Sequence, residues 1–263
     1  MTTQPHRQIN AHELISGVIE DPDYERNSQR TSNLRHAFTT TALALAEMGT
    51  DKAGKRTRLA DQLDVSAQVP GFIASVTAID TAKTGNYTLL DDVREKYVSN
   101  IVGFNHSLEA MIKADPEASF NEVMKFLMGM YAYQYSDRTD EQTAAVQKHL
   151  EERLTGMVSE VIFDQLAEYS NYQVEGASVE DDMSGIDRFI KVGKDWIGVD
   201  VKTSSDIARE ARVKHPENFI VSMGIPKETM RGRLCLSANS VARYAPAFKE
   251  EVKRELERHG FVV

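Results

Sequence analysis

The stretch GIDRFIKVGKDWIGVDVK, residues 185–202, decides how the fold of this chain is read. Two apolar runs that alternate like β-strands flank the pair Gly193-Lys194, and glycine in the first position of a two-residue connection is typical of a type II′ hairpin turn. A turn at these two residues places Asp187 directly opposite Asp200. Facing residues in such a ladder have Cβ atoms about 4.5–5.5 Å apart. The stretch therefore predicts two carboxylates that face each other.

The alternation of side chains divides this hairpin into two faces. The acidic face carries Asp187, Asp200 and Lys202, together with Phe189 and Gly198. The other face is suited to a core and has one arginine, which we expect to reach past the edge of the sheet. Its members are Ile186, Arg188, Ile190, Ile197, Val199 and Val201.

Like charges directly opposite each other destabilise a sheet, so the facing acids call for compensation. A divalent cation supplies it, since magnesium binds one or two carboxylates and keeps its other positions for water and substrate phosphate. Two alternatives stay open: Lys202 alone screens the two acids, or a longer loop shifts the pairing by one residue.

GID followed by VDVK resembles the split motif of the PD-(D/E)XK, or restriction-endonuclease-like, nuclease superfamily. In that pattern an acid on one strand is followed, after a short hairpin, by acid-any-Lys on the next strand. Asp187 matches the first acid, and Asp200-Val201-Lys202 matches the second part. Ile186 stands where the pattern has a proline.

The resemblance implies an α/β fold, with a restriction-endonuclease-like αβββαβ core and a central mixed sheet in residues 144–263. A similar order of elements covers about residues 150–226: a helix with an apolar stripe, three strands, a helix and a strand. Residues 1–143 match nothing in the family, and their apolar spacing predicts an all-α N-terminal domain. Helices are expected over 34–49, 88–114, 119–135 and 144–172, and strands over 172–177, 186–192, 196–202 and 218–225.

The resemblance also implies an activity, that of a metal-dependent nuclease which hydrolyses phosphodiester bonds in DNA rather than RNA. Such a protein would be an endonuclease of restriction, repair, mobile-element or viral type. The cofactor would be Mg²⁺, with Mn²⁺ as a substitute. The implied catalytic residues are Asp187, Asp200, Lys202 and Glu160, and the implied metal ligands are Asp187, Asp200, the Val201 carbonyl and Glu160.

The family often takes a third acid from the helix before the first strand. Glu160 lies on the flank of the apolar stripe of that helix and is the candidate for this role, with Asp164 and Glu175 behind it. An exposed helical glutamate without function is the competing interpretation.

Charge is distributed unevenly along the chain, whose total is −9. Residues 151–200 hold 4 Lys and Arg against 12 Asp and Glu, whereas residues 201–263 hold 12 against 8. An acidic block beside a basic one suits a cation site next to an anion-binding surface. The candidate phosphate contacts are Arg209, Arg212, Lys227, Arg231 and Arg233.

Other features of the sequence limit the classes of protein to which this chain can belong. Cys235 is the single cysteine, so an internal disulfide and a multi-cysteine zinc site are excluded. The opening residues lack an apolar run of signal-peptide length, and no window approaches about 18 consecutive apolar residues. We therefore expect a soluble, cytoplasmic protein without a membrane partner.

Two other functions compete with the nuclease. A nuclease fold can persist as an inactive binding or assembly module with vestigial acids. Residues 55–76 also resemble a helix-turn-helix, which would make the chain a DNA-binding regulator, although Pro70 falls where the recognition helix should continue. Because cutting a duplex usually takes two active sites, a homodimer is a further expectation.

Overall fold

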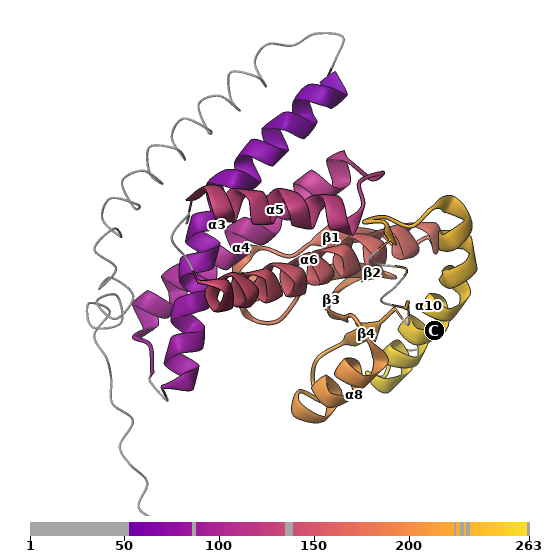
Figure 1. Ribbon diagram of the computed structural model, residues 1–263. Helices are drawn as coiled ribbons and strands as arrows, with labels where there is room; N and C mark the ends of the chain where they lie inside the picture. Colours follow the sequence, from indigo (N-terminus) through magenta and orange to yellow (C-terminus); the bar gives the residue numbers. More distant parts are fainter. Residues whose placement is uncertain are drawn as a thin grey trace, which may run out of the picture. The chain divides into compact units, whose positions relative to one another are not determined.

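The computed structural model describes residues 53–85, 88–134, 139–223, 225–226, 229 and 232–261. Within these ranges the protein is α/β, with helices and one four-stranded mixed sheet (Figure 1), as expected. The helix expected over 34–49 lies outside them. The elements are α3 (Ala53–Thr84), α4 (Asp91–Ala114), α5 (Phe120–Gln134), α6 (Asp140–Tyr169), β1 (Val174–Gly176), α7 (Val179–Met183), β2 (Arg188–Val192), β3 (Asp195–Lys202), α8 (Ser205–Lys214), β4 (Ile220–Ser222) and α10 (Ala238–Arg258).

The described chain divides into two compact units. The first contains residues 53–114 and 126–149, and the second contains residues 115–125 and 150–261. Helices α5 and α6 therefore contribute residues to both units. None of the helices in the described ranges is long and apolar enough to cross a membrane.

In the first unit, α3 packs along α4, and this pairing corrects one expectation. Residues 53–84 form a single helix with Pro70 inside it, so the helix-turn-helix expected over 55–76 is wrong. Proline removes one backbone hydrogen bond from a helix. Packing offsets that loss, because Phe72, two residues after the proline, is fully buried and stacks on Phe104 of α4 with ring centroids 4.3 Å apart.

The sheet belongs to the second unit and has the order β1-β2-β3-β4. Antiparallel pairing joins β1 to β2 and β2 to β3, whereas β4 runs parallel to β3. A parallel neighbour needs a crossover connection, which α8 supplies. Helix α7 was not expected; Ser178 and Asp181 start it with a capping box, each side chain bonding the other residue's backbone N–H.

The predicted hairpin register is confirmed. Arg188 pairs with Val199, Ile190 with Ile197, and the last pair before the turn is Val192 with Asp195. Gly193 has a φ of 63°, whereas Lys194 has no positive φ, and this combination is that of a type II′ turn. The turn thus sets which side chains share a face.

The apolar face of the hairpin and the stripe of α6 form the core of the second unit. Ile190 and Val199 are fully buried. Phe163 of α6 meets Phe248 of α10 edge to face, with ring centroids 5.4 Å apart. The stripe residues predicted for α6 are all buried: Leu154, Met157, Val158, Val161 and Ile162.

Candidate active site

Asp187 and Asp200 come together at the end of the hairpin away from the turn. The ladder stops at Arg188, and the N–H of Asp187 donates to the Val199 carbonyl at 2.9 Å, so the two acids are not a ladder pair. Instead Oδ2 of Asp187 accepts a 2.7 Å hydrogen bond from the N–H of Val201. This bond holds the Asp187 carboxylate against β3, beside the residue that follows Asp200.

The two carboxylates repel each other across this short separation. Burial raises the pKa of Asp187 to about 7, and the negative charge of Asp200 contributes in the same direction, with a smaller contribution from Asp182. The Val201 N–H and the Lys202 ammonium oppose the shift without cancelling it. Burial and the neighbouring acid thus both disfavour the charged form of the Asp187 carboxyl.

Asp200 and Lys202 form the second half of the site. Asp200 is 7% exposed, and its Oδ1 makes an ion pair with Nζ of Lys202. That same oxygen makes no hydrogen bond within the part of the chain that the structure describes. The Lys202 ammonium is therefore the charged partner of this buried oxygen, and a cation bound at Asp200 would have to share it with the lysine.

A pocket of about 490 Å³ opens beside these two residues. Asp200 and Lys202 lie in its wall, whereas Asp187 does not. The rest of the wall comes from the turn after α7 and from α8 with the residues that follow it: Ser184, Gly185, Ile207, Glu210, Ala211, Lys214, His215, Glu217 and Asn218. The volume suits a small ligand or one segment of a larger one.

Ile186 occupies a different face from the one expected. A Cβ added to Gly198 would lie 2.9–3.2 Å from the side chain of Ile186, so that side chain covers Gly198 on the acidic face. The placement as a core-facing strand residue is wrong because Ile186 precedes β2, and its N–H bonds the Asp181 carbonyl. Glycine at 198 leaves the room that Ile186 needs beside Asp187.

Glu160 contacts the hairpin at Arg188. Its Oε2 lies 2.7 Å from Nη1 of Arg188, and Oδ1 of Asp164 lies 2.9 Å from Nε of the same guanidinium. Nη1 also donates to the Asp187 carbonyl at 2.8 Å. Arg188 is 3% exposed, so the expectation that it leaves the sheet edge is wrong. In the sequence, Arg188 stands among the apolar residues of the core face, and this position could have indicated that it has an acidic partner in the core.

The predicted three-acid metal site is not assembled by these contacts. Among the described residues, no group of three or more His, Cys, Asp or Glu side chains lies close enough to hold a metal ion. Glu175, the other reserve candidate, is exposed on β1 opposite Phe189. Two facing carboxylates and one lysine are what the structure brings together.

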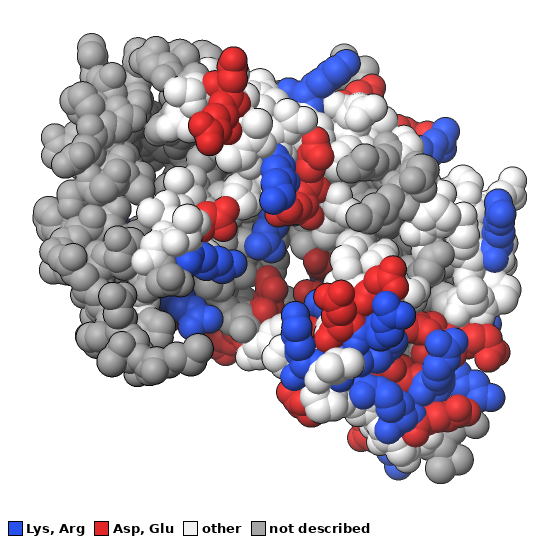
Figure 2. Space-filling view, turned by 60° about the horizontal axis from the view of Figure 1, so that its bottom comes forward, with Lys and Arg blue, Asp and Glu red and all other residues white. Residues whose placement is uncertain are grey.

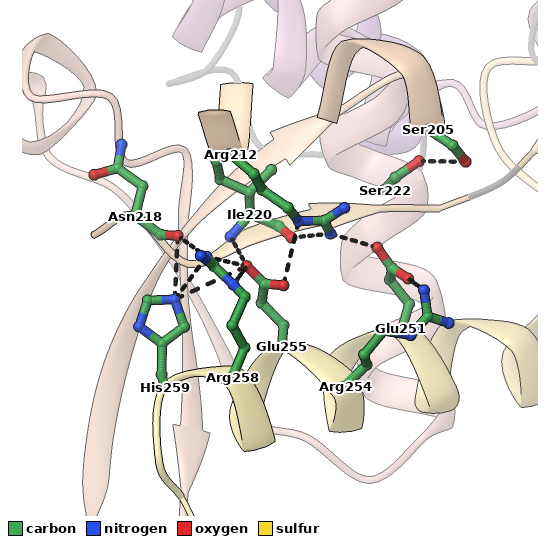
Figure 3. A network of polar contacts seen from close by, with 10 residues as sticks. All are labelled: Ser205, Arg212, Asn218, Ile220, Ser222, Glu251, Arg254, Glu255, Arg258 and His259. Carbon is green, nitrogen blue, oxygen red and sulfur yellow. Dashed lines mark hydrogen bonds and ion pairs between the residues drawn. The ribbon is translucent and has the colours of Figure 1, made fainter. Parts of the chain in front are cut away.

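Arg212, a predicted phosphate contact, serves the packing of β4. It donates to the Ile220 carbonyl at 2.7 Å and to Glu251 of α10 at 2.6 Å, and its Nε lies 3.3 Å from the buried carboxylate of Glu255 (Figure 3). Glu255 in turn accepts the N–H of Ile220 at 3.0 Å. Arg212 is thus tied to three partners and is not a free cation for phosphate.

The remaining predicted phosphate contacts are dispersed. Arg209 pairs with Asp206 at 3.0 Å, and Arg233 pairs with Glu117 at 3.4 Å, all four on exposed side chains. Lys227 and Arg231 lie outside the described residues. On the face shown in Figure 2, Lys and Arg side chains are interleaved with Asp and Glu.

Comparison with known proteins adds no family. None of the family models, curated proteins or solved structures compared with the chain matches it significantly.

Proposed function

We propose that the chain is a metal-dependent nuclease that hydrolyses phosphodiester bonds in DNA, with a restriction-endonuclease-like core around the hairpin. The observation that carries this proposal is the pair of acids: Asp187 is held against β3 beside Asp200, and burial, together with the charge of Asp200, raises the pKa of Asp187 to about 7. Lys202 shares their face. Acid groups held in such an arrangement are typical of sites that work on a charged substrate.

A divalent cation suits the donor set that these residues offer. Magnesium is satisfied by one or two carboxylates, with water and phosphate in its other positions, so two acids suffice. Asp187, Asp200 and the Val201 carbonyl would hold the ion, and Glu160 is left out because Arg188 engages it. When bound, such an ion lowers the pKa of a coordinated water and neutralises charge on the phosphate.

The side chains themselves have separate tasks in this proposal. The Val201 N–H orients Oδ2 of Asp187, which keeps the first carboxylate in a single direction. Lys202, restrained by Asp200, donates hydrogen bonds to the attacking water or to a phosphate oxygen. In a partly buried pocket such a donor stabilises the negative charge that develops during hydrolysis.

An inactive nuclease-fold module is the alternative, favoured by the contact of Lys202 with Asp200 and by the loss of the third acid to Arg188. A substrate screen separates the two. Plasmid, linear duplex and single-stranded DNA are incubated with Mg²⁺ or Mn²⁺ and, in parallel, with EDTA. We expect cleavage that depends on the metal; binding without cleavage of every substrate supports the inactive module instead.

The same proposal includes a homodimer for any cut through both strands, since each site cleaves one strand. Sedimentation of the chain with and without duplex DNA measures this directly. A monomer that cuts both strands of a duplex in one encounter would contradict it.

A further inference from the structure

The acidic face of the hairpin continues toward the turn with a lysine and a tryptophan. Lys191 on β2 pairs with Trp196 on β3 in the confirmed register, and Nζ of the lysine lies 5.7 Å from the ring centroid. Trp196 is 39% exposed, and it is the only tryptophan of the chain. Trp196 and Lys191 thus form a partly exposed aromatic–cation pair on the acidic face.

The two side chains lie in line with the candidate active site. Residues 196, 198 and 200 alternate onto one face of β3, and Gly198 between them is covered by Ile186. Four residues of strand place Trp196 about 13 Å from Asp200. That is the rise of at most about four stacked nucleotides in one strand of nucleic acid.

We propose that Trp196 and Lys191 form a stacking platform for an unpaired base of the substrate strand, within about four nucleotides of the phosphate held at Asp187 and Asp200. The inference rests on the proposed nuclease function and names its substrate class, which is a strand with an unpaired segment. Aromatic rings bind bases of any sequence because every base has a π-face. The ammonium of Lys191 supplies the neighbouring phosphate contact.

An unpaired segment fits this platform better than a duplex does. Bases in a duplex stack on each other, so a single ring at the end of a hairpin reaches a base face only where the strand is open. The path is also constrained by charge. Glu175 of β1 lies on this same face beside Phe189, so the strand is expected to run over β2 and β3 and away from β1.

The single tryptophan makes the platform directly observable. Wild-type protein in EDTA is titrated with a single-stranded oligothymidylate and, separately, with a blunt duplex, while fluorescence is excited selectively at tryptophan. We expect strong quenching by the single strand and clearly weaker quenching by the duplex. Equal quenching by both, or none by the single strand, overturns the inference.

Variants measure the contribution of the ring by fluorescence anisotropy of a labelled single strand in EDTA. Trp196→Ala should weaken binding about 5- to 150-fold, the range for loss of one stacked base. Trp196→Phe, which keeps a ring, should restore most of the affinity. Tyr169→Ala removes another exposed aromatic, on α6, and should change nothing. Unchanged affinity of Trp196→Ala, with the fold intact by circular dichroism, also overturns the inference.

These results separate the platform from the activity on which it rests. Quenching and a Trp196 effect without any metal-dependent cleavage support the binding surface and contradict the nuclease. Metal-dependent cleavage of single-stranded DNA that Trp196→Ala leaves unchanged, at DNA concentrations below saturation, supports the nuclease and contradicts the platform.

Discussion

The two faces of one strand pair show two ways of holding acids. On the core side, Arg188 lies between Glu160 and Asp164 and contacts both, with all three side chains at most 13% exposed. On the other side, Asp187 and Asp200 approach each other, and the one lysine contacts Asp200 alone. Each arrangement sets one cation against two carboxylates, and among the contacts of the described residues only the core-side cation bonds both acids and compensates them directly.

This difference separates a structural cluster from a candidate site. A buried ion pair with good geometry has little left to bind, because its charges and hydrogen bonds are already matched. A buried carboxylate such as Asp187, whose pKa is raised by burial and by a neighbouring acid, is one that a bound cation can stabilise. The number of acidic residues in the sequence does not show which of them belong to a structural cluster and which to a candidate site. That depends on where the Arg188 guanidinium lies in the folded protein.

The largest effect is expected from removing the compensation on the core side. Arg188→Met takes away the guanidinium that Glu160 and Asp164 share, which should lower the free energy of unfolding by about 3–5 kcal/mol. Denaturant unfolding in EDTA measures this. Adding Glu160→Gln and Asp164→Asn to the same chain should recover much of the loss. A loss below about 1 kcal/mol for Arg188→Met would contradict a compensated cluster.

The next effect concerns cleavage at the acidic face. Asp200→Asn and Lys202→Ala should each lower the rate of metal-dependent cleavage about 100- to 1000-fold, as loss of a group that stabilises the transition state does, with binding of DNA in EDTA largely kept. Lys249→Ala, an exposed lysine of α10, is the matched control and should cut normally. If both site variants cut at the wild-type rate, the assignment of the site is wrong.

A smaller effect follows from the raised pKa of Asp187. The pKa of Asp187 is about 7 in the folded protein and about 4 in the unfolded chain, so the folded state binds this proton more tightly. The contribution of Asp187 to stability is therefore complete below about pH 4 and is lost as the pH rises through about 7. Asp187→Asn keeps an acceptor for Val201 and should therefore stabilise the metal-free protein by roughly 2 kcal/mol at pH 8 and little at pH 4.

Thermal and denaturant unfolding at both pH values tests this prediction. Addition of Mg²⁺ or Mn²⁺ at pH 8 should stabilise the wild type and leave Asp187→Asn unchanged. A stability change that is the same at both pH values would contradict the raised pKa of Asp187.

The smallest effect is expected at Gly198. Gly198→Ala brings a methyl group within 2.9–3.2 Å of Ile186, which must shift next to Asp187, at a cost of about 1 kcal/mol. The double variant Gly198→Ala, Ile186→Ala should recover this loss in denaturant unfolding. Because Arg188 lies on the opposite face of the hairpin, Gly198→Ala tests only the face that carries Asp200 and Lys202. If Ile186→Ala does not restore the stability lost in Gly198→Ala, the contact between the new methyl group and Ile186 is not the cause of the loss.

Much of the hairpin could be predicted from the sequence because its determinants are local. A glycine in the first turn position and period-two alternation on either side were enough for the register, and the apolar stripe of α6 followed from helical spacing. The face of Ile186 could not be obtained in this way, since the strand begins two residues later than its pattern predicts. The continuous helix through Pro70 depends on packing against α4, which a local rule about proline ignores.

The sequence by itself determined the register of the hairpin, and with it that Asp200 and Lys202 share one face of β3, because side chains alternate along a strand. Asp187 precedes β2 and reaches them through its hydrogen bond to the Val201 N–H. Only the tertiary structure decided which further charges reach the hairpin. Glu160 lies 28 residues before Arg188 in the chain, and their contact depends on how a helix packs on a sheet. Residues far apart in sequence meet through the packing of whole elements, for which periodicity and spacing carry no information.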